Sequence, residues 1–96
     1  MKQFLLSIAL IAGLMAAAPA SAAECYADYK AKRDNPLKLH YGVMQLRGGC
    51  DRQSARAEVS ARLQQNGWKL LNVMSVFGPE GLAGRRANAG HFYLRF

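Results

Sequence analysis

The sequence contains few of the side chains on which most catalytic and metal sites depend. Only two residues are cysteine and two are histidine, and neither pair forms a Cys-x-x-Cys or His-x-x-x-His motif. A redox-active dithiol and a zinc site of that ligand spacing are therefore not indicated. His40 and His91 could share a metal if their strands were neighbours, but partly exposed histidines are the more common arrangement, and we expect no metal site.

Acidic residues are also scarce, and the serines lack the sequence surroundings that activate a nucleophile. The six carboxylates show no paired spacing typical of general acid and base catalysis, and no serine lies in a Gly-x-Ser-x-Gly motif. The glycine-rich stretch 78–90 matches neither G-x-x-x-x-G-K-[ST] nor G-x-G-x-x-G, the phosphate-binding and dinucleotide-binding patterns. These absences predict a protein that is not an enzyme and that holds no cofactor.

What the chain does have is a leader with the parts of a secretory signal peptide. Lys2 supplies a positive start, residues 4–18 are an uncharged apolar run, and Ala20 and Ala22 are small residues of the kind that signal peptidase recognises. A run of 15 residues is shorter than the ~20 that span a bilayer, which disfavours a transmembrane anchor. We therefore predict that residues 1–22 are removed and that residues 23–96 form a single small domain.

The mature chain is expected to be periplasmic or secreted and to carry no membrane anchor. A lipid on Cys25 would need a small residue before it, whereas Glu24 occupies that position. In an oxidising compartment two cysteines of a small protein usually pair. We predict a disulfide between Cys25 and Cys50, which closes a loop of about 25 residues and stabilises the fold by roughly 3 kcal/mol.

Basic residues outnumber acidic ones. The chain has 13 basic and 6 acidic residues, and loss of Lys2 with the leader lowers the net charge from +7 to +6. Such a charge favours anionic partners, such as envelope lipids or acidic glycans, and the absence of an RNA-binding signature speaks against nucleic acid. Arg85 and Arg86 could present two guanidinium groups to a phosphate or carboxylate, although a solvated hairpin loop is the alternative interpretation.

The first half of the mature chain predicts two segments of regular structure. Residues 24–33 are rich in helix formers but also alternate in polarity, so that a short helix, which the composition favours, and a strand both remain open. Residues 37–46 alternate as a strand does. The side expected to face inward consists of Leu37, Leu39, Tyr41 and Val43.

The clearest helix lies between Asp51, which can cap its start, and Asn66-Gly67, which can end it. A buried stripe at four-residue spacing is expected from Ala55, Val59 and Leu63. Residues 67–77 are apolar on both sides and predict a central strand, and residues 91–96 alternate as a last strand after a loop at 78–90.

The predicted fold is therefore α+β, with a three-stranded sheet packed on one helix in the order β-α-β-β. The disulfide would pin the short helical or extended N-terminal segment, residues 24–33, to this core. One helix would leave the other sheet face without cover, so that either the leading segment or a second copy of the chain could pack there.

The run Gly67-Trp68-x-Leu70-x-x-Val73 after a helix end resembles a motif of short exported bacterial proteins of unknown function. The resemblance covers about residues 37–96, implies a compact α+β domain and transfers no catalytic residues. We expect a non-enzymatic binding module for an anionic envelope component or a protein partner. The alternative is a structural homodimer without ligand.

Overall fold

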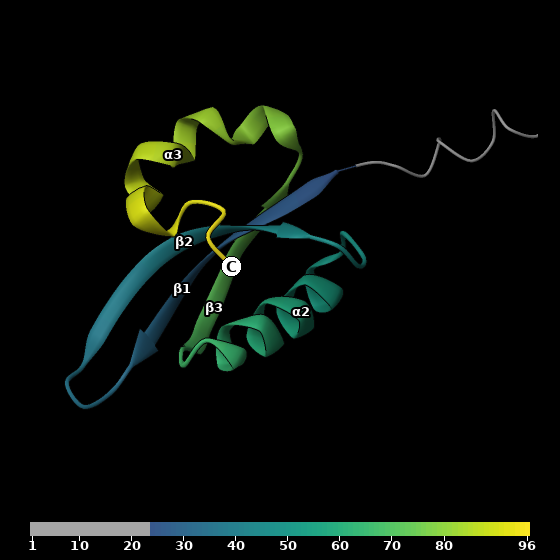
Figure 1. Ribbon diagram of the computed structural model, residues 1–96. Helices are drawn as coiled ribbons and strands as arrows, with labels where there is room; N and C mark the ends of the chain where they lie inside the picture. Colours follow the sequence, from purple (N-terminus) through teal and green to yellow (C-terminus); the bar gives the residue numbers. More distant parts are fainter. Residues whose placement is uncertain (1–23) are drawn as a thin grey trace, which may run out of the picture.

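β1 (Cys25–Arg33) is the central strand of a three-stranded antiparallel sheet (Figure 1). It pairs with β2 (Lys38–Leu46) on one side and with β3 (Lys69–Phe77) on the other. The computed structural model describes residues 24–96, and the predicted signal peptide, residues 1–22, lies outside the described residues.

Helix α2 (Arg52–Gln65) packs on one face of this sheet and forms the main core with it. The completely buried residues of the helix are Ala55, Val59 and Leu63. Asp51 accepts a hydrogen bond from the amide of Ser54 at the start of the helix, and Gly67 follows its end with φ 82°. The predicted helix, its cap and its buried stripe are therefore confirmed.

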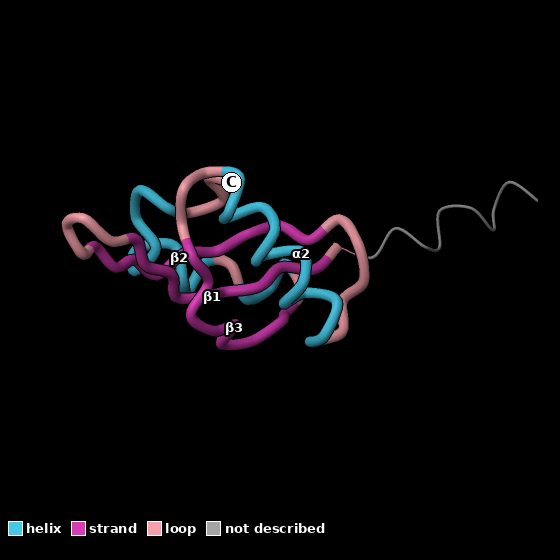
Figure 2. The backbone as a smooth tube through the Cα atoms, turned by 90° about the horizontal axis from the view of Figure 1, so that it is seen from below, coloured by secondary structure: helices cyan, strands magenta, loops and turns pink. Residues whose placement is uncertain are grey.

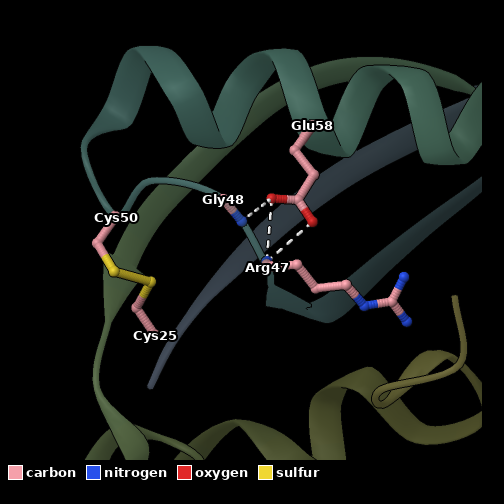
Figure 3. The surroundings of a disulfide bond; sticks show 5 residues. All are labelled: Cys25, Arg47, Gly48, Cys50 and Glu58. Atoms are coloured by element: carbon pink, nitrogen blue, oxygen red, sulfur yellow. Dashed lines mark hydrogen bonds between the residues drawn. A yellow bond between two sulfur atoms is a disulfide. The ribbon is translucent and has the colours of Figure 1, made fainter. Parts of the chain in front are cut away.

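A disulfide joins the start of β1 to the start of α2, as the sequence predicted. The sulfur atoms of Cys25 and Cys50 are bonded, and Figure 3 shows a second connection beside them. The Glu58 carboxylate accepts hydrogen bonds from the backbone amides of Arg47 and Gly48 over 3.0 to 3.1 Å. The connection between β2 and α2 is thus fixed both covalently and by an acidic side chain of the helix.

The α+β class, the three-stranded sheet, the packed helix and the disulfide-pinned first segment are confirmed, but the strands come in a different order. The first segment is not the helix that its composition favoured; it is β1, so the described elements begin β-β-α-β. Ala27, Tyr29 and Ala31 are buried toward α2, and Tyr26 and Asp28 are buried on the opposite face. Burial on both faces outweighs the helix propensity of the segment.

β3 lies at the edge of the sheet, so its predicted central position was wrong. Only Val73 is buried within it, and two register shifts leave Leu71 and Met74 without a partner in β1. Each such β-bulge shifts the alternation by one residue, which is why both sides of the segment carry apolar residues. At the bulge between Val73 and Ser75, the Arg52 guanidinium donates hydrogen bonds to the backbone carbonyls of Val73 and Met74.

The predicted strand 91–96 and loop 78–90 were also wrong. The structure has a short 3-10 helix at Pro79–Gly81, α3 at Ala83–Ala89 and a second 3-10 helix at Gly90–Phe92. After these helices, the C-terminal segment pairs with β2 through one isolated β-bridge, between Val43 and Tyr93. Ala89 of α3 packs with Tyr26 and Val43 in a cluster separate from the α2 core, and Figure 1 shows the two helices on opposite sides of the sheet, so the second face is not left without cover.

Candidate functional site

α3 carries both arginines that the sequence singled out, and it gives them different surroundings. Arg85 Nε donates to Asp28 Oδ2 over 3.0 Å, and Nη1 donates to the Gly81 carbonyl over 2.8 Å. The guanidinium carbon also lies 3.9 Å from the centre of the Phe77 ring. Arg85 therefore anchors α3 to the sheet, and its charge already has a carboxylate partner.

Arg86 points elsewhere. Its side chain is exposed, and its guanidinium carbon lies 5.4 Å from the centre of the Tyr93 ring. Neighbouring residues of a helix do not face the same side, so the expected pair of guanidinium groups around one ligand is not assembled. Anion binding by Arg85 and Arg86 stays a prediction, although the Arg85 charge already has a carboxylate partner.

Asp28 joins three strands and α3 through one carboxylate. Tyr41 Oη donates to Oδ2 and Ser75 Oγ donates to Oδ1, each over 2.7 Å, in addition to the bond from Arg85. Burial by itself would raise the pKa of Asp28, but these three hydrogen bonds outweigh it and lower the pKa. Burial and the adjacent carboxylate together raise the pKa of Tyr41 to about 12. All these partners hold the carboxylate in its ionised form, which suits a structural anchor.

His40 lies on the α2 face of the sheet, inside an aromatic cluster. Its Nε2 is 3.0 Å from Tyr29 Oη, and its ring stacks on Phe92 at 3.7 Å between centres and meets Trp68 edge-on at 4.3 Å. Burial, with a smaller contribution from the Arg33 charge, lowers the pKa of His40 to about 4. The expectation of an outward, partly exposed His40 was therefore wrong.

The aromatic cluster forms the wall of an open pocket of about 340 Å³ beside the C-terminal segment. This C-terminal pocket is lined by Arg33, Asn66, Trp68, His91, Phe92, Arg95 and Phe96. The end of β1, the end of α2 and the last residues of the chain thus meet at one place. The volume falls in the range of small-molecule sites, about 300–1,000 Å³.

Positive charge and aromatic surface coincide in this pocket. Arg33 lies with its guanidinium carbon 4.4 Å from the centre of the Trp68 ring, and Arg95 lies 5.9 Å from that of Phe96. No Asp or Glu side chain lines the pocket, and within residues 24–96 neither arginine forms an ion pair with an acidic side chain. Two guanidinium groups without an Asp or Glu partner, held beside aromatic rings, can bind the acidic group of a ligand whose apolar part rests on the rings.

This pocket was not predicted from the sequence. Arg33 was expected to end the first segment and Arg95 to lie in a last strand, and nothing in the sequence places the two together. The available signal for the pocket was a set of aromatic residues, each next in sequence to a basic or histidine residue: Trp68, Phe92 and Phe96.

Among residues 24–96 no group of three or more metal-ligating side chains comes together. In the same part of the chain, no helix has the length and apolar character needed to cross a membrane. The disulfide of this small domain is compatible with an extracellular location. Comparison with protein-family models, with curated proteins and with solved structures finds no significant match. Function is therefore inferred from the residues of this chain.

Proposed function

We propose that this chain is an exported, non-enzymatic binding module that takes an anionic ligand in the C-terminal pocket. The observation that carries the proposal is the pair Arg33 and Arg95, two guanidinium groups over aromatic rings in a pocket without Asp or Glu side chains. A periplasmic or secreted location, where the disulfide can form, brings the module into contact with anionic components of a cell envelope.

The pocket favours a particular chemical class of ligand. A guanidinium group binds a planar carboxylate or a phosphate through two parallel hydrogen bonds, and the Trp68 and Phe92 rings add apolar contact area. An acidic group on an aromatic or aliphatic body satisfies both parts of the site, whereas free inorganic phosphate satisfies only one.

Calorimetric titration with 2-naphthalenesulfonate, 2-naphthoate and 2-naphthylmethanol tests the proposal. We expect both anions to bind with at least tenfold higher affinity than the neutral alcohol. In an Arg33→Gln/Arg95→Gln variant, we expect the affinity for the anions to fall at least tenfold, because both charge-assisted contacts are lost. Equal affinity for the alcohol and the anions would contradict the proposal.

Arg47→Gln/Arg56→Gln is the matched control, since it removes the same charge from two exposed side chains outside the pocket. We expect its affinity to remain within about twofold of that of the unsubstituted chain at moderate salt, where distant surface charges are screened. An Arg86→Gln variant tests the α3 arginine in the same assay. A loss of affinity in Arg86→Gln, together with unchanged affinity in Arg33→Gln/Arg95→Gln, would place the binding site on α3 instead.

A structural homodimer is the second candidate. It is supported by two exposed apolar side chains on the edge strand β3, Leu71 and Met74, which are 44% and 40% exposed. Light scattering on the purified chain at high micromolar concentration distinguishes the candidates. A monomer mass would exclude the dimer.

A further inference from the structure

The hairpin between β1 and β2 carries two leucines that nothing in the described part of the chain covers. Leu37 and Leu39 are 63% and 65% exposed, more than any other large apolar side chain of residues 24–96. Figures 1 and 2 show the turn between the two strands extending away from α2 and α3. The exposed leucines therefore lie at the end of a projecting element.

The same hairpin tip, defined as residues 30–39, is strongly basic. Its cations are Lys30, Lys32, Arg33 and Lys38, and its single carboxylate is Asp34. Asp34 lies 3.5 Å from Lys32 Nζ, so it offsets one of the four charges. The tip is thus apolar at two positions and carries a net charge of +3 over ten residues.

Leu39 also forms part of a shallow apolar pocket on the side of the hairpin. This pocket, of about 300 Å³, is lined by Lys30, Ala31, Leu39, His40, Tyr41 and Leu71. Its lining residues extend from β2 across β1 to Leu71 of β3, and Lys30 is one of them. Apolar surface bordered by lysines is the composition of protein elements that lie in a membrane interface.

We infer that the hairpin tip docks on an anionic lipid bilayer, with Leu37 and Leu39 inserted between headgroups and the cations bound to lipid phosphates. Charge complementarity supports a lipid surface, since basic residues beside a membrane are attracted by anionic headgroups. The shape of the element supports it further. A projecting tip penetrates a soft planar surface, whereas a protein partner would need a matching acidic groove. The membrane surface is distinct from the C-terminal pocket, although Arg33 borders both.

Vesicle sedimentation with the chain that begins at Ala23 tests this inference, because residues 24–96 contain the sheet, helices α2 and α3 and the disulfide. Vesicles of phosphatidylcholine with an equal amount of phosphatidylglycerol are compared with vesicles of phosphatidylcholine alone. We expect at least tenfold stronger partitioning to the anionic vesicles. Absence of binding to the anionic vesicles would overturn the inference.

A Leu37→Ser/Leu39→Ser variant separates insertion from attraction by charge alone, since its net charge is unchanged. We expect at least a tenfold loss of partitioning to the anionic vesicles. The matched control is Met74→Ser/Leu94→Ser, which replaces two exposed apolar side chains outside the tip, and we expect it to bind within about twofold of the unsubstituted chain. Equal binding of all three proteins would overturn the insertion of the leucines.

A fluorescence measurement reports insertion directly. In a Leu37→Trp variant we expect the emission to shift to shorter wavelength when anionic vesicles are added, while the buried Trp68 contributes a constant background. An unchanged spectrum in the presence of bound vesicles would overturn the inference. The Arg95→Gln variant keeps the tip intact, so it should retain vesicle binding while losing affinity for the naphthyl anions. A failure of ligand binding in the C-terminal pocket and a failure of membrane binding by the hairpin tip are therefore distinguishable.

Discussion

Arg85 Nε lies 3.0 Å from Asp28 Oδ2, and this ion pair joins helix α3 to the central strand of the sheet. The Asp28 side chain is almost completely buried, whereas Arg85 is about one-third exposed. The network therefore explains why an arginine that the sequence suggested for ligand binding has a structural role.

Replacement of Arg85 by methionine should destabilise the protein by about 2 kcal/mol, because a buried carboxylate loses its cationic partner. The effect is smaller than for a fully buried pair, since Tyr41 and Ser75 still donate to Asp28. Urea unfolding followed by circular dichroism measures it. Arg86→Met, which removes the same charge from an exposed position, should change stability by less than about 0.5 kcal/mol. Equal effects of the two substitutions would contradict the structural role of Arg85.

Removal of the disulfide should have a larger effect. A Cys25→Ala/Cys50→Ala variant should lose about 3 kcal/mol of stability, because the unfolded chain regains the entropy of an open loop of 25 residues. Thermal unfolding of the variant and of the unsubstituted chain with and without reductant provides the measurement. A reductant-insensitive unfolding temperature in the unsubstituted chain would mean that the bond is absent.

Stability should fall as the pH is lowered from about 6.5 toward 4, and His40 should be the main cause. The pKa of His40 is lowered in the folded chain to about 4, so in this range the unfolded state binds a proton that the folded state does not. The loss reaches up to about 3 kcal/mol near pH 4 and is absent above pH 7. A His40→Gln variant should flatten the dependence. His91→Gln replaces an exposed histidine and should leave it unchanged, and the reverse pattern would contradict the burial of His40.

Replacement of glycine by alanine should change the stability of the protein in opposite directions at two positions. A Cβ at Gly42 would collide with the phenol ring of Tyr29, which is completely buried, so Gly42→Ala should destabilise the protein by about 2 kcal/mol. Gly84 lies inside α3 with open space around its position, so Gly84→Ala should stabilise by about 0.5–1 kcal/mol. Urea unfolding of both variants checks the signs.

The parts of the fold that the sequence predicted are those with local signals. Helix α2 has a cap, a four-residue apolar stripe and a terminal glycine within one continuous segment, and all three are present in the structure. The disulfide followed from the cysteine count and the expected compartment. The buried position of β1 depended on partners distant in sequence, so local composition favoured a helix there.

The errors at β3 and at the C-terminus have physical causes that periodicity does not detect. Two bulges in β3 shift the alternation, and an edge strand with exposed Leu71 and Met74 then resembles a central one. In α3, glycine content suggested a loop, but the contact of Arg85 with Asp28 and burial of Ala89 hold the helix on the sheet. The C-terminal pocket could not be predicted, because its two arginines lie 62 residues apart in the sequence and meet only after folding.

Nuclear magnetic resonance of the labelled chain with bound 2-naphthoate tests the binding site most directly. We predict intermolecular nuclear Overhauser effects from the naphthyl protons to the rings of Trp68 and Phe92, together with shifts of the guanidinium Nε–H signals of Arg33 and Arg95. Contacts confined to α3, or no contacts at saturating ligand, would contradict the account.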